Sequence, residues 1–139
     1  MAQLERVELE PLFVVTGPAG ERDISLAEVE LGQVIPADYK DLLRITDGLS
    51  SGGNLVLLGA ADIVERNRDY EVAVYLPGHV MIGDDSGGTA ILMRCGQSAV
   101  FEVDMGAMDM ASLERSASSL RQLLVEFGGR TLGEREIVE

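Results

Sequence analysis

The side chains of this chain that could carry nucleophilic or acid–base chemistry are few. It has one histidine, His79, one cysteine, Cys95, and a serine, Ser86, set among acidic residues and glycines in Gly83-Asp84-Asp85-Ser86-Gly87-Gly88. Serine, histidine and aspartate together are the groups that acyl-transfer enzymes use, because the imidazole must take the proton of the attacking hydroxyl. The first question is therefore whether this run belongs to a catalytic site or to a turn.

The run Asp85–Gly88 resembles the loop that carries the nucleophile in chymotrypsin-like serine proteases. In that fold the histidine comes from a separate barrel, whereas His79 precedes Ser86 on the same local strand and 139 residues cannot form two barrels. A hairpin turn accounts for the same residues, because glycine supplies positive φ and Asp and Ser bond their own backbone. We therefore expect a turn, with Gly87 and Gly88 at positive φ, and no catalytic residue.

The other candidate chemistries also lack residues that they need. Asp84 and Asp85 are not followed by the further acidic residues of an EF-hand loop. No lysine stands in the phosphate-binding position near Ser86. One histidine and one cysteine cannot make the usual zinc site, and Cys95 has only Arg94 beside it as an activating cation. We expect no enzyme activity, metal or cofactor, although spacing alone does not exclude a pair of catalytic carboxylates among 24 acidic residues.

Composition narrows the class of protein and its partners. A chain of 139 residues, of which 46% are hydrophobic and 25% are charged, is typical of one globular domain. The sequence has no apolar run long enough to span a bilayer, its start lacks the pattern of a secretory signal, and its single cysteine fits a reducing compartment. These features predict a cytoplasmic protein. A net charge of −13 argues against nucleic acid and anionic membranes as partners and favours basic ones, although acidic surfaces also serve solubility.

The first half of the chain is predicted to be mainly helical. A short strand over 12–16 and a turn over 17–20 come first. Ser25 then has the spacing to cap a helix that runs to Gly32, with Leu26 and Val29 on its apolar face. A second helix begins at Pro36 and ends at Asp47-Gly48, and one face of it is formed by Tyr39, Leu42, Leu43 and Thr46.

The second half is predicted to be a meander of strands closed by a helix. A buried strand over 55–58 precedes a helix over 62–67 capped by Asp62, and residues 72–75 form a strand or an extended link. Strands over 80–82, 89–93 and 99–103 follow. An apolar stripe predicts a last helix over 111–127, formed by Leu113, Ala117, Leu120, Leu124 and Phe127. Met105, Met108 and Met110, just before it, could form an adaptable contact surface or fill gaps under a loop.

The order of these elements predicts an α+β fold in one domain, with a largely antiparallel sheet flanked by helices. We divide the chain into an N-terminal segment with a short strand (1–24), the domain itself (25–127) and a loose charged tail (128–139).

Several short motifs, in their order and spacing over residues 27–124, resemble the SMI1/KNR4 (SUKH) superfamily. The chain departs from its pattern by lacking tryptophan and by having Asp47 where asparagine is usual before the glycine. The residues that carry the resemblance are Ile35, Pro36, Tyr39, Gly48, Gly83, Gly87 and Gly88.

The resemblance implies an SMI1/KNR4-like α+β fold and a protein-binding role rather than catalysis. Many bacterial members resemble immunity proteins, which neutralise a toxin by binding it, and a nuclease-type toxin would be basic. Other members are general interaction or regulatory modules, which is the alternative reading; a small-molecule-binding protein or hydrolase is a more distant one. The acidic residues that we expect to contact a partner are Asp62, Glu65, Asp69, Glu71, Asp84 and Asp85.

Overall fold

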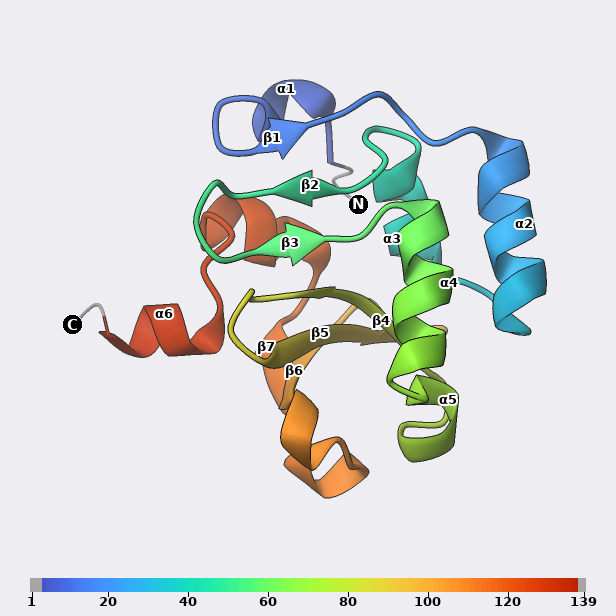
Figure 1. Ribbon diagram of the computed structural model, residues 1–139. Helices are drawn as coiled ribbons and strands as arrows, with labels where there is room; N and C mark the ends of the chain where they lie inside the picture. The colour runs from blue at the N-terminus through green and yellow to red at the C-terminus, as the bar shows by residue number, and fades with distance from the viewer. Residues whose placement is uncertain (1–3, 138–139) are drawn as a thin grey trace.

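The centre of the molecule is one antiparallel sheet of seven strands, which lie side by side in chain order. The computed structural model describes residues 4–137. The first three strands are two residues each, and the wider part of the sheet is built from the later four (Figure 1). The strands are β1 (Val14–Val15), β2 (Leu49–Ser50), β3 (Val56–Leu57), β4 (His79–Asp84), β5 (Thr89–Arg94), β6 (Val100–Asp104) and β7 (Glu114–Ala117).

Helices cover the sheet on both sides. Figure 1 shows α2 and α4 side by side at one end of the molecule, and α1 and α6 toward the other. Two 3-10 turns (Met105–Ala107 and Met110–Ser112) join β6 to β7, and a π-helical turn (Gln122–Glu126) follows β7. The α-helices are α1 (Arg6–Leu9), α2 (Glu21–Leu31), α3 (Ala37–Leu43), α4 (Ala60–Asp69), α5 (Val72–Tyr75) and α6 (Leu132–Ile137).

The sheet separates two hydrophobic cores. Side chains alternate along a strand, so Val80 and Ile82 of β4 face the larger core while Met81 faces the smaller one. The larger core contains residues of α1 to α4 and of the π-helical turn, and the smaller one contains Val72 of α5 and Leu76. All six residues of β4 are buried as a result, which explains its nearly continuous apolar sequence.

The structure confirms the antiparallel α+β architecture, and most of the predicted strands lie within a residue or two of their expected positions. The face predicted for the helix after Pro36 is also confirmed, since Tyr39, Leu42 and Leu43 are buried. The helix itself ends at Leu43, four residues earlier than expected. Thr46 is buried outside the helix, where its hydroxyl donates to the carbonyl of Gly48.

Two predicted helix starts are wrong. Helix α2 begins at Glu21 after Gly20, so Ser25 is inside the helix and does not cap it. The face shifts accordingly: Ile24 and Ala27 are buried, whereas Leu26 and Val29 point to solvent with 54% and 77% of their surface exposed. Helix α4 begins at Ala60 rather than after Asp62, because its first N–H is bonded by a side chain from elsewhere in the chain, described below.

The predicted helix over 111–127 is also wrong, as is the strand or link over 72–75, which is helix α5. Residues 114–117 pair with β6 instead, with Arg115 opposite Phe101 and Ala117 opposite Val100. Ala117 and Leu120 are buried as the apolar stripe requires, but Ala117 belongs to strand β7 and Leu120 lies between that strand and the π-helical turn. Pairing at the edge of an existing sheet therefore outweighs local helix propensity here.

The tail was expected to be loose, but residues 132–137 of it form α6, directly after a buried Thr131; residues 138–139 of the predicted tail lie outside the described residues. The carboxylate of Glu102 on β6, itself buried, accepts hydrogen bonds from the backbone N–H of Leu132 (2.9 Å) and the hydroxyl of Ser116 (2.5 Å). Arg135 donates to the carbonyl of Ser116 and lies over the ring of Phe127. At the other end of the chain, Leu9 and Phe13 of the N-terminal segment lie in the larger core.

Candidate functional site

The start of helix α4 is fixed by the pair Asp47-Gly48. Asp47 Oδ1 accepts a hydrogen bond of 2.8 Å from the backbone N–H of Ala60, so a residue 13 positions earlier caps the helix. Gly48 has a φ of +87°, and a Cβ there would lie 2.8 Å from the backbone nitrogen of Gly59. A Cβ on Gly59 would in turn lie 2.7 Å from Asp47 Oδ1. The two glycines therefore allow the close approach that brings the cap to the helix.

The middle of α4 is attached to the sheet by Asn67. Its side-chain amide nitrogen donates to the carbonyls of Ile63 (2.8 Å) and Met81 (2.9 Å), and its oxygen accepts from the N–H of Met81 (2.8 Å). The amide satisfies backbone groups of β4 next to the irregularity between Met81 and Gly83. Because Asn67 is buried, these bonds are shielded from water and hold α4 in one position on β4.

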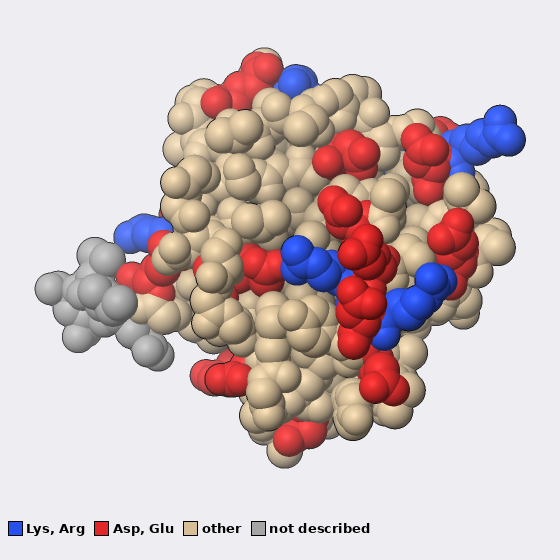
Figure 2. All heavy atoms as spheres, in the orientation of Figure 1, with Lys and Arg blue, Asp and Glu red and all other residues tan. Residues whose placement is uncertain are grey.

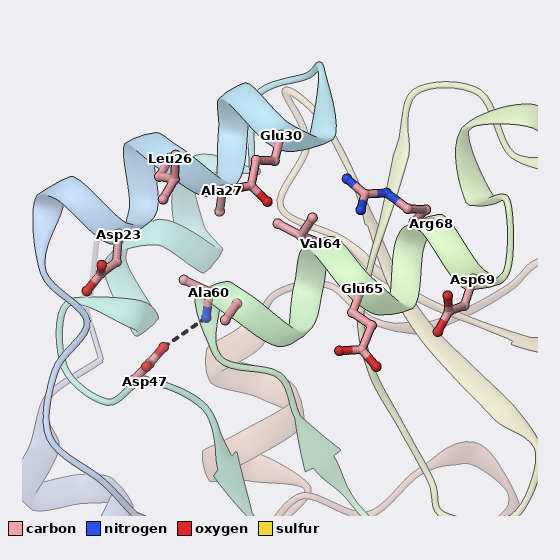
Figure 3. Close-up of a pocket in the computed structure, with 11 residues that line it drawn as sticks. Asp23, Leu26, Ala27, Glu30, Asp47, Ala60, Val64, Glu65, Arg68 and Asp69 are labelled. Atoms are coloured by element: carbon pink, nitrogen blue, oxygen red, sulfur yellow. Dashed lines mark hydrogen bonds between the residues drawn. The ribbon is translucent and has the colours of Figure 1, made fainter.

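Helix α4, held in this way, forms a groove with α2. The groove has a volume of about 550 Å³ and is lined by residues of both helices and by Asp47 (Figure 3). Its apolar lining consists of small or short side chains, which leave room between the helices: Leu26, Ala27, Ala60, Ala61 and Val64.

The polar lining of the groove is strongly acidic. Five carboxylates and a single guanidinium, that of Arg68, line it, and Figure 2 shows acidic side chains gathered over α4 and beside it. Apart from Asp47, which caps α4, none of these charged side chains has a hydrogen-bond or ion-pair partner among the described residues. Their charges therefore face solvent and are available to a partner. The five acids are Asp23, Glu30, Asp47, Glu65 and Asp69.

The acidic residues predicted to contact a partner fall into two places. Glu65 and Asp69 line the groove, and Glu71 lines a smaller adjoining hollow of about 240 Å³. Asp62 is exposed on α4 but lines neither hollow. The structure thus brings three of the six residues to one surface.

The two remaining acids, Asp84 and Asp85, serve their own turn. Asp84 is 8% exposed, and its carboxylate accepts from Arg66 (2.8 Å) and from the N–H of Ser86 (2.9 Å). Asp85 Oδ1 accepts from the N–H groups of Gly87 and Thr89. Both carboxylates are therefore engaged within the chain, and we do not place them on the contact surface.

The turn between β4 and β5 does not assemble a catalytic group. The hydroxyl of Ser86 donates to the carbonyl of Asn54 (2.8 Å). His79 lies at the other end of β4, about 17 Å from Asp84 along the strand, where it is buried with its ring edge-on to Phe101. Positive φ is found at Ser86 (62°) and Gly88 (100°), so the expectation for Gly87 is wrong. Ser86 and His79 cannot act as nucleophile and base.

The other reactive groups are also placed structurally. The thiol of Cys95 donates to the carbonyl of Val34, and burial raises the pKa of Cys95, which disfavours the reactive thiolate. Within the described part of the chain, no three His, Cys, Asp or Glu side chains come together as metal ligands. None of the helices that the structure describes is long and apolar enough to cross a membrane.

Half of the groove was missed by sequence reasoning. Asp23, Leu26 and Glu30 lie on α2, whose apolar face was assigned wrongly once its start was placed at Ser25. The buried face of α2 is indicated by Ile24, Ala27 and Leu31, because these apolar residues are three and four positions apart and so lie on one side of a helix. The part played by Asp47 has no local signal, because its partner lies 13 residues away.

Comparison with known families gives one result. Residues 18–126 match the family described as SMI1 / KNR4 family (SUKH-1). The matched range contains α2, α4, the Asp47-Gly48 pair and Gly59, and hence the whole groove. No curated protein matches the chain.

Proposed function

The chain belongs to the SMI1/KNR4 family (SUKH-1), and on this premise we propose that it is an immunity protein that neutralises a cognate bacterial toxin by binding it in the cytoplasm. The proposed mechanism needs no chemistry from this chain, only a surface that covers the working surface of the toxin. A nuclease-type toxin would suit this surface, because an enzyme that acts on a polyanion presents positive charge.

The observation that carries the proposal is the acidic groove between α2 and α4. Apart from Asp47, which caps α4, its carboxylates face solvent, whereas the buried Glu102 and Asp84 are bonded within the chain. The chain as a whole carries −13, so long-range attraction would bring a basic protein toward it at a high rate. Steering of this kind matters for an inhibitor that must reach a toxin before the toxin acts.

The test uses the tagged chain as bait in its native cells, followed by a functional assay on what it retains. We expect recovery of one basic protein that is toxic when expressed alone. Co-expression of this chain should restore growth, and the purified chain should inhibit the toxin at equimolar amounts. Recovery of non-toxic signalling or housekeeping proteins would instead indicate a general interaction module and would contradict the immunity function.

A further inference from the structure

We infer that the groove between α2 and α4 is the docking surface for a basic, amphipathic segment of a protein partner, one that presents arginine or lysine together with aliphatic side chains. The inference rests on the proposed function for the identity of the partner, but the chemistry of the segment follows from the groove itself.

The groove has the length of a peptide segment rather than of a single ion. The larger hollow and the smaller one share Glu30, Val64 and Arg68, so they form one continuous depression along α4 toward α5. Helix α4 has ten residues and is therefore about 15 Å long. A depression of this length can take three turns of a helix or several residues of an extended chain.

Exposed apolar side chains follow the same depression. Leu26 on α2 and Val74 on α5 line it and are 54% and 67% exposed. Val29, one helical turn after Leu26, lines neither hollow but is 77% exposed on the same helix. A single exposed aliphatic residue carries little information, but such residues along one acidic groove form the mixed surface typical of protein interfaces. A purely ionic ligand would leave these side chains in water.

The charge of the groove selects a cationic occupant. Glu65 and Asp69 are four residues apart on α4, where like charges repel each other and weaken the helix. A guanidinium or ammonium group placed between them would remove this repulsion and gain two attractive contacts. The alanines at 27, 60 and 61 leave space for the stem of such a side chain.

The experiment measures binding of short peptides to the full chain by fluorescence anisotropy. One labelled peptide has arginines and leucines on opposite faces of a helix, and its twin has neutral citrulline in place of each arginine. The groove variant is Glu65→Gln/Asp69→Asn. The matched control is Glu114→Gln/Glu126→Gln, which changes the net charge equally at two exposed residues elsewhere.

We expect the arginine peptide to bind and the citrulline peptide not to bind. The groove variant should weaken binding about fivefold or more, and the control variant less than twofold, since the two lost ion pairs are local. Ala61→Trp, which fills the groove without changing charge, should also weaken binding. Equal loss in the groove and control variants would overturn the inference, because only net charge would then matter.

A small polycation is the competing occupant, and spermine is the probe for it. One outcome is that spermine displaces the arginine peptide while Leu26→Asn changes neither the affinity for spermine nor the affinity for the peptide. In that case the groove is a polycation site and the inference is wrong. The toxin assay separates the two proposals. If the groove variant neutralises the toxin as well as the wild type does, the immunity function stands and this docking surface falls. If the peptide binds as expected but no toxin is found, the docking surface stands and the immunity function falls.

Discussion

Replacement of Asp47 by alanine tests how the groove is built. The change removes the 2.8 Å hydrogen bond to the N–H of Ala60 and leaves that N–H without a side-chain partner. Because the site is partly exposed, water can replace the bond, and the loss should be that of a typical helix cap, about 1 kcal/mol. For a chain of this length the unfolding entropy converts this loss into a decrease in Tm of about 3 °C.

The assay is urea and thermal unfolding of three variants. Asp47→Asn keeps an oxygen acceptor and should retain more than half of the lost stability. Asp62→Ala removes the residue that the sequence predicted as the cap, and it should lose only a few tenths of a kcal/mol, since this carboxylate only interacts with the helix dipole. A larger loss for Asp62→Ala than for Asp47→Ala, or an equal loss for Asp47→Asn and Asp47→Ala, would refute the reasoning.

Four further predictions concern the elements that hold the fold. Tyr39→Phe should lower the free energy of unfolding by about 1–2 kcal/mol in urea, because the buried hydroxyl donates to a backbone carbonyl at 2.5 Å. Glu102→Ala should cost about 3 kcal/mol and make α6 sensitive to trypsin, since its loss removes the acceptor of the buried Ser116 hydroxyl and of the partly buried N–H of Leu132; unchanged proteolysis would contradict this role. Gly88→Val should be destabilising in thermal unfolding and Gly87→Val nearly neutral, because of these two glycines only Gly88 has positive φ. The guanidinium of Arg121 donates to the carboxylate of Glu8 and lowers the pKa of Glu8. The stability that this ion pair contributes is therefore present above the ordinary glutamate pKa of about 4.3 and is lost as the pH falls below that value. Glu8→Gln should flatten this part of the pH–stability curve.

The sheet was predictable because its signals are local. The apolar runs around Met81 and Leu92 and the glycine-rich turn between them specify a hairpin without reference to the rest of the chain. The burial of Tyr39 and Leu42 was equally readable, since helical spacing marks the face that must pack. For these elements the arrangement that follows from the local apolar pattern is also the one that buries the apolar side chains.

The elements that could not be predicted depend on distant partners. Asp47 and Glu102 act on backbone groups 13 and 30 residues further along the chain, so no window around α4 or α6 contains the group that fixes its start. The stripe around Ala117 is buried in a strand as well as it would be in a helix, and only the free edge of β6 decides between them. The groove combines α2 with α4 and exists only once both helices pack on the sheet.

The central claim is that this chain inhibits a toxin by covering it with the acidic face of α2 and α4. The most direct measurement is a titration of the purified toxin partner with the wild-type chain and with Glu65→Gln/Asp69→Asn, followed by the activity of the toxin. We predict that activity disappears at one wild-type chain per toxin and that the variant requires a clear excess. Full toxin activity in the presence of excess wild-type chain would contradict the claim.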